Sequence, residues 1–183
     1  DLTQKYHLAS ANSINISRLI PQSFYYFWAY AQLQKLGNKL PIVFSVPSGN
    51  FGNLSAGLMA YKMGLPVQHF VAATNANDVV PRYLVSGSYE PLKSKETISN
   101  AMDVGNPSNF IRMRLLAGDN WENVSGLIKG FTYTDNETRT KMKAVYDQTK
   151  YIMCPHTAVA QLGADEYKAK INKNVATVVL STA

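Results

Sequence analysis

LPIVFSVPSGNFGN, residues 40–53, begins as a short β-branched and aromatic run and ends in a glycine-bracketed turn. The run predicts a strand, and the turn marks its end. Helix-forming residues then fill 54–63, and a second apolar run of strand length covers 67–73. The chain therefore predicts a β-α-β unit over residues 40–73. Because the strands of such a unit run parallel, a ligand is expected at their carboxyl ends, where the turn lies.

Helix and strand signals continue on both sides of this unit. Asn77 is expected to cap a helix, and Thr134 with Glu137 forms the Ser/Thr-x-x-Glu capping pattern of another. Residues 86–130 are interrupted by Gly, Ser, Asn and Pro, so only one helix is predicted there. The predicted helices cover 22–36, 77–84, 107–116, 134–150 and 155–167, and a last strand covers 175–180.

These elements predict an α/β fold, with an open and mostly parallel sheet and flanking helices. No internal repeat, low-complexity tract or linker divides the chain. Its first residues, Asp1 to Lys5, contain neither an initiator methionine nor the basic-then-apolar order of a signal peptide. We therefore expect residues 1–183 to form a single truncated α/β unit of a longer protein.

Composition limits the classes of function. The 183 residues are 46% hydrophobic and 16% charged, a balance that favours a packed core over disorder. The net charge of +6 comes from scattered residues without a basic stripe, so no nucleic-acid partner is predicted. No apolar run reaches the roughly 18 residues of a membrane span, so no membrane partner is expected. Cys154 is the single cysteine, which rules out an internal disulfide and favours a cytoplasmic location.

The turn after the first strand has the features of a phosphate cradle. Glycines let backbone N–H groups approach an anion closely, and a helix amino end adds unpaired N–H groups and a favourable dipole. A tight strand-to-helix turn without a ligand is the alternative interpretation. The cradle would consist of Gly49, Asn50, Phe51, Gly52 and Asn53.

Two common nucleotide sites do not match this turn. A dinucleotide fold needs Gly-x-Gly-x-x-Gly and an acidic residue near the end of the second strand, where this chain has Ala72 to Asn75. No Gly-Lys-Ser or Gly-Lys-Thr of a nucleoside-triphosphate loop occurs either. A compact phosphorylated cofactor remains the best candidate, although a generic nucleotide-binding domain stays open.

Several ordered segments resemble the threonine synthase family, which belongs to the tryptophan-synthase-β-like enzymes of pyridoxal-phosphate fold type II. They are ANSINISRLIPQSFYYF (11–27), VPSGNFGNLSAGLMAYKMGLPV (46–67), FVAATNANDVVPR (70–82), SNAMDVGNPSNFIR (99–112), PHTAVA (155–160) and VVLSTA (178–183). The resemblance implies that residues 49–53 hold the phosphate of pyridoxal 5'-phosphate. It also implies that the Thr182 hydroxyl meets the pyridine nitrogen, where a neutral partner tempers the electron-sink strength of the cofactor.

A second polar cluster precedes the first helix. Arginine binds phosphate through paired N–H groups, and amides and hydroxyls orient it. By resemblance the cluster would hold the phosphoryl end of O-phospho-L-homoserine; helix capping with a surface arginine is the alternative. The four candidate substrate-binding residues are Asn12, Ser13, Asn15 and Arg18.

No catalytic residue is assigned within the chain. The family's Schiff-base lysine is normally followed by aspartate, and no lysine here is. We therefore expect an inactive piece of an enzyme that converts O-phospho-L-homoserine and water to L-threonine and phosphate, with self-association through truncated surfaces. A catalytically dead phospholigand-binding relative, or another fold-type II pyridoxal-phosphate lyase, remains an alternative. His156 and Cys154 receive no role, no metal-ligand spacing is present, and most amides of 75–109 are expected in turns.

Overall fold

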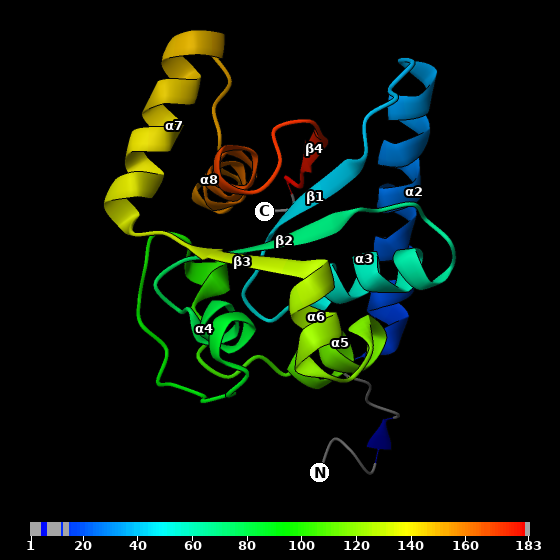
Figure 1. The fold of residues 1–183 in the computed structure, drawn as a ribbon. Helices are drawn as coiled ribbons and strands as arrows, with labels where there is room; N and C mark the ends of the chain where they lie inside the picture. Colours follow the sequence, from blue (N-terminus) through cyan, green and yellow to red (C-terminus); the bar gives the residue numbers. More distant parts are fainter. Residues whose placement is uncertain (1–4, 7–11, 13–14, 182–183) are drawn as a thin grey trace.

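The centre of the molecule is a parallel sheet (Figure 1). The computed structural model describes residues 5–6, 12 and 15–181. Its four strands lie in the order β3-β2-β1-β4, and every neighbouring pair is parallel. This confirms the α/β fold class with an open parallel sheet. The strands are β1 (Ile42–Pro47), β2 (His69–Thr74), β3 (Ile128–Thr132) and β4 (Ala176–Val179).

Helices cover both faces of the sheet, as Figure 1 shows, with α8 on one face and α3, α4, α5 and α6 on the other. The helix α2 packs against α3 and forms the outer flank of that second face. The helical elements are η1 (Ile16–Arg18), α2 (Leu19–Lys35), α3 (Gly52–Lys62), α4 (Val79–Ser86), η2 (Asn100–Met102), α5 (Phe110–Ala117), α6 (Trp121–Leu127), α7 (Asp135–Thr149) and α8 (Pro155–Lys170).

The alternation of side chains along the central strands produces two hydrophobic cores. Phe44 and Phe70 point to the face of α2 and α3 and join a cluster that includes Tyr26. Val43 and Val71 point to the opposite face and pack with residues of α8. All five are fully buried, so both faces of β1 and β2 are covered. This explains why these strands are continuous apolar runs in the sequence.

The predicted β-α-β unit is confirmed: α3 connects β1 to its parallel neighbour β2. The capping box of α7 is also confirmed, since the Thr134 hydroxyl accepts from the Glu137 N–H and the Glu137 carboxylate accepts from the Thr134 N–H. The predicted Asn77 cap is wrong. The helix α4 begins at Val79, because the Asn77 side chain instead bonds the backbone of Lys95 at both N–H and C=O.

Three elements that begin within residues 86–130 were not predicted, namely η2, α6 and β3. β3 is an edge strand of mixed exposure containing Lys129 and Gly130, so it carries no clear strand signal. A Cβ at Gly130 would lie 2.8 Å from the Cα of Pro81 in α4. This glycine therefore allows the close approach of α4 to the sheet.

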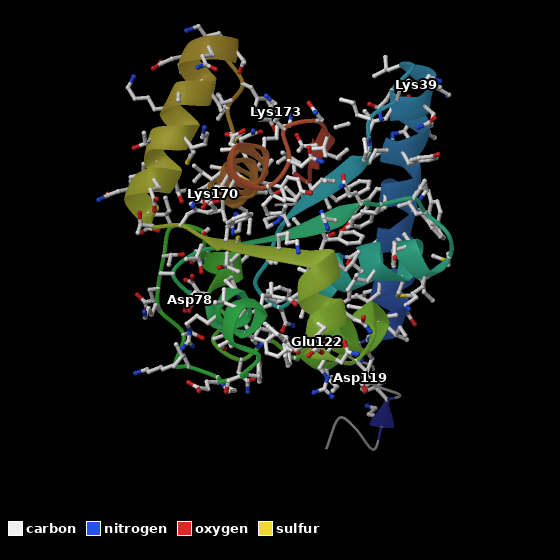
Figure 2. All side chains as sticks on the ribbon, viewed as in Figure 1. Lys39, Asp78, Asp119, Glu122, Lys170 and Lys173 are labelled. Carbon is white, nitrogen blue, oxygen red and sulfur yellow. The ribbon has the colours of Figure 1, made fainter. Side chains whose placement is uncertain are left out.

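Charged side chains lie at the periphery. Figure 2 shows the labelled lysines, Lys39, Lys170 and Lys173, above the sheet and the labelled acids, Asp78, Asp119 and Glu122, below it. Among the helices of the described residues, none combines the length and apolarity needed to span a membrane.

Candidate cofactor-phosphate site

The glycine-bracketed turn lies between the carboxyl end of β1 and the amino end of α3. Phe51 is the N-cap residue of α3, with φ 61° and ψ 15° in the left-handed region, and its ring is only 4% exposed. The Phe51 side chain cannot accept a hydrogen bond, so the N–H groups of the first helical turn receive no cap from it. Its buried hydrophobic ring instead anchors the turn. The left-handed conformation is uncommon in non-glycine residues; Asp119 and Lys150 also adopt it in this chain, and in Phe51 it occurs at the cavity-lining turn.

Gly49 allows a second segment to approach the turn. A Cβ at this position would lie 2.6 Å from the Cα of Met102 and 3.1 Å from the carbonyl oxygen of Ala101. Both are backbone atoms that a side chain could not displace without moving the chain. The residue is therefore required to be glycine for contact with η2, and residues 101–102 become part of the site wall.

Two asparagines of the turn fix it to neighbouring elements. The Asn50 side-chain oxygen accepts from the Ser108 N–H at 2.7 Å, and the Asn109 side chain donates to the Asn50 carbonyl oxygen at 3.0 Å. On the other side, the Tyr26 hydroxyl donates to the Asn53 side-chain oxygen at 2.7 Å. These contacts hold the turn from α2 on one side and from the residues just before α5 on the other.

A cavity of about 180 Å³ opens at the turn. Its walls include the predicted cradle residues but also Gln22 of α2 and His156 of α8, which sequence reasoning did not assign to the site. A larger hollow of about 610 Å³ lies between α4 and β3 and contains none of the predicted site residues. The lining of the smaller cavity is Gln22, Pro47, Gly49, Asn50, Phe51, Gly52, Asn53, Ala101, Met102 and His156.

The family model described as "Pyridoxal-phosphate dependent enzyme" matches residues 3–182. The chain belongs to this family. The cavity therefore lies in an enzyme scaffold that uses a phosphorylated cofactor, and the five predicted cradle residues all contribute to its wall. A signal for the two missed residues was present in the sequence, since Gln22 and His156 occur in two of the family-like segments, residues 11–27 and 155–160.

Within the pyridoxal-phosphate family, the chain is similar to threonine synthases. It is 50% identical over 171 residues to that of Haemophilus influenzae, covering 92% of this chain and 39% of the relative. The crystal structure of threonine synthase from Escherichia coli matches with a TM-score of 0.87 and 41% identity, over 100% of this chain and 41% of that one. A PLP-bound threonine synthase from Brucella melitensis matches with a TM-score of 0.86 and 31% identity, over 97% and 42%. The chain thus spans about two fifths of the length of these relatives.

Two of the predicted substrate residues, Asn15 and Arg18, lie just before the start of α2. Asn15 caps η1, accepting from the Ser17 N–H at 3.0 Å, and Arg18 ends η1 one helical turn before Gln22. Neither residue contributes to the wall of the 180 Å³ cavity. The Asn15 cap matches the alternative interpretation, yet a role in substrate binding stays a prediction. Ser13 and Thr182 lie outside the described residues.

The amides after β2 form a buried network instead of simple turns. The Asp103 carboxylate accepts from the Asn75 side chain at 2.8 Å, from the Thr97 hydroxyl at 2.7 Å and from the Thr97 N–H at 2.9 Å. Asn75 also donates to the Ser99 hydroxyl at 3.0 Å. This network holds the segment that carries Ala101 and Met102 against the glycine turn.

The remaining candidate side chains have structural partners. The Cys154 sulfur is the N-cap group of α8 and accepts from the Thr157 N–H at 3.4 Å. Within the part of the chain that the structure describes, no group of three or more His, Cys, Asp or Glu side chains could hold a metal ion.

Proposed function

We propose that this chain is the cofactor-phosphate-binding part of a threonine synthase, an enzyme that uses pyridoxal 5'-phosphate to convert O-phospho-L-homoserine and water to L-threonine and phosphate. The main support is the left-handed Phe51 turn, which leads into α3 at the edge of the 180 Å³ cavity. The 50% identity to a threonine synthase favours this enzyme over other members of the family.

The described residues fit a phosphate group at this turn. The helix start offers backbone N–H groups and the positive end of an 11-residue helix dipole. Two residues of the cavity wall each have a buried polar atom without a partner among residues 5–6, 12 and 15–181, namely the Gln22 Oε1 and the His156 Nδ1. Buried polar groups normally have partners, so we expect a bound water or a polar ligand to complete these two atoms.

Bound pyridoxal phosphate would supply the electron sink for elimination and addition. The chain's own residues would fix the phosphate through residues 49–53 and meet the pyridine nitrogen through the Thr182 hydroxyl. Asn12, Ser13, Asn15 and Arg18 would bind the substrate phosphoryl group. Since none of the chain's lysines precedes an aspartate, the chain alone should not produce threonine from O-phospho-L-homoserine. Turnover above background with added cofactor would contradict this.

Binding is best tested with pyridoxine 5'-phosphate, which keeps the ring and phosphate but cannot form adventitious imines with surface lysines. Calorimetry should show binding of this probe and none of unphosphorylated pyridoxine. Gly49→Ala should weaken binding by about tenfold or more, because its methyl group forces the turn away from Met102. Gly126→Ala is the matched control, since a Cβ there meets no atom within 4 Å. Equal affinities of the two variants would refute the role of the turn.

Self-association is the proposed partner behaviour of the isolated chain, alongside the small-molecule substrate. Ile16, Ile20, Phe24 and Trp28 are spaced four residues apart along η1 and α2 and are between 47% and 66% exposed. This exposed apolar stripe suits contact with a second copy. Sedimentation velocity should show association that Phe24→Glu weakens. The cytoplasmic location expected from the sequence remains a proposal as well.

A further inference from the structure

The cavity has polar atoms without partners in walls built from two different helices. Gln22 comes from α2 and His156 from the first turn of α8, which lie on opposite faces of the sheet (Figure 1). The Gln22 Oε1 and the His156 Nδ1 are both buried and without a hydrogen-bond partner among the described residues. Both residues line the cavity at the glycine turn; an acceptor atom of a ligand there could satisfy the His156 nitrogen, whereas the Gln22 oxygen needs a donor.

The tautomer of His156 follows from its one backbone contact. The Ala101 N–H donates to the His156 Nε2 at 3.3 Å. A nitrogen that accepts a hydrogen bond presents its lone pair, so the neutral ring carries its hydrogen on Nδ1. Burial lowers the pKa of His156, while the negative charge of Asp103 opposes part of this change. The ring is therefore neutral near pH 7 and its Nδ1–H is a donor that needs an acceptor.

The orientation of the ring depends on the same segment that closes the site. Ala101 and Met102 pack against Gly49, and the Asp103 network fixes both. The imidazole is thus held by Ala101 in a position set by the turn that binds the phosphate. Such a link between the turn and a second helix preorganises a donor for one ligand position.

We propose that His156 is a ligand-binding residue, whose Nδ1–H donates a hydrogen bond to an anionic oxygen of the phosphorylated ligand held by residues 49–53. This inference rests on the proposed function of the turn. It adds a direct contact from α8, a helix that the glycine motif does not include. Gln22 lies in the wall with His156 and gives the ligand a second polar side chain.

Two substitutions distinguish the nitrogens of the ring. His156→Asn keeps an N–H donor near the Nδ1 position, and His156→Gln places its amide near Nε2 and leaves the Nδ1 position empty. In calorimetry with pyridoxine 5'-phosphate, H156Q should bind about tenfold more weakly than the unmodified chain, the usual effect of losing a hydrogen bond to a charged acceptor. H156N should stay within about threefold. Thermal unfolding followed by circular dichroism should show that both variants are folded.

A spectroscopic measurement tests the tautomer without reference to affinity. In ¹⁵N-histidine spectra, the His156 signals, identified by their loss in H156Q, should show protonated Nδ1 in the free chain and a shift of Nδ1 on adding the probe. His69, whose Nδ1 lies 2.5 Å from the Tyr167 hydroxyl, is the internal control and should not shift. Unchanged affinity of H156Q, equal losses in both variants, or protonated Nε2 would overturn this inference alone. Absence of probe binding to the unmodified chain would overturn the proposed function as well.

Discussion

The β-α-β unit over residues 42–74 and the irregular segment over 87–109 both contribute to the cavity wall, but different forces shape them. In the first, apolar strands and a helix bury hydrophobic side chains on both faces of the sheet. In the second, side-chain hydrogen bonds to Asp103 replace regular secondary structure. The comparison shows that one site can combine a hydrophobically fixed turn with a segment fixed by polar contacts. Mutations in the two parts should therefore differ in how strongly they lower stability and in which residues they expose to hydrogen exchange.

The largest effect is expected in the irregular segment, from Asp103→Ala. This change removes the acceptor of the part-buried Thr97 N–H and one acceptor each of the Thr97 hydroxyl and the Asn75 side chain, both of which keep a hydrogen bond to Ser99. The free energy of unfolding should fall by about 3 kcal/mol, measured by urea denaturation. Hydrogen exchange should accelerate first over residues 95–104. The β1 and β2 amides should keep their protection until global unfolding.

Glu96→Ala is the control for this substitution. It removes an exposed carboxylate from the same segment, so it should change the unfolding free energy by less than about 0.5 kcal/mol. If D103A were no more destabilising than E96A, the polar network would not be what holds the segment. Faster exchange throughout β1 in D103A would show that the two regions are one cooperative unit.

A smaller effect is expected in the β-α-β unit from Tyr26→Phe. The change keeps the ring, which packs on Phe44 and Phe70, and removes the hydroxyl that donates to Asn53. The loss of unfolding free energy should be about 1 kcal/mol, because one buried hydrogen bond disappears while the hydrophobic contacts remain. Tyr30→Phe, one turn further along α2, provides a matched control. A loss as large as that in D103A would mean that polar contacts dominate in both regions.

The first region could be predicted from the sequence and the second could not, because only the first is determined by local sequence patterns. β1, α3 and β2 are encoded by local patterns: apolar runs, a glycine turn and helix-forming residues. The network around Asp103 joins residues up to 28 positions apart. Hydrophobic periodicity does not indicate side-chain hydrogen bonds between such distant residues. Asn77 illustrates this. Asparagine is a common helix-capping residue, but the Asn77 side chain instead hydrogen-bonds the backbone of Lys95 in a distant loop.

The residues of the candidate site likewise divide into those that the sequence predicted and those that it did not. Residues 49–53 were predicted because a glycine turn after a strand has a recognisable pattern. His156 reaches the cavity only because α8 packs across the sheet, and Gln22 only because α2 packs on α3. Their residue types alone carry no such information. For Gln22 and His156, the resemblance to known enzymes indicated the segments 11–27 and 155–160 but not which of their side chains line the cavity.

The smallest effect is expected at an element with purely local encoding, the capping box of α7. Thr134→Ala removes the hydroxyl that accepts from the Glu137 N–H at an exposed position and should cost about 0.5 kcal/mol of unfolding free energy near pH 7, the lower end of the usual range for a cap. Thr134→Ser keeps the hydroxyl and should be nearly neutral. A large effect on the 87–109 segment in either variant would contradict local encoding.

The pH dependence of this effect has a defined sign. Hydrogen bonds from the Thr134 hydroxyl and backbone N–H lower the pKa of Glu137 below its ordinary value of 4.5. A group whose pKa is lower in the folded state stabilises the fold above its unfolded-state pKa, and this contribution disappears as the pH falls through the folded-state value. The difference in unfolding free energy between the unmodified chain and T134A should therefore be greatest near neutral pH and shrink below about pH 4. The Glu137 carboxyl ¹³C shift should titrate at higher pH in T134A. A constant difference down to pH 3 would show that Glu137 takes no part in the cap.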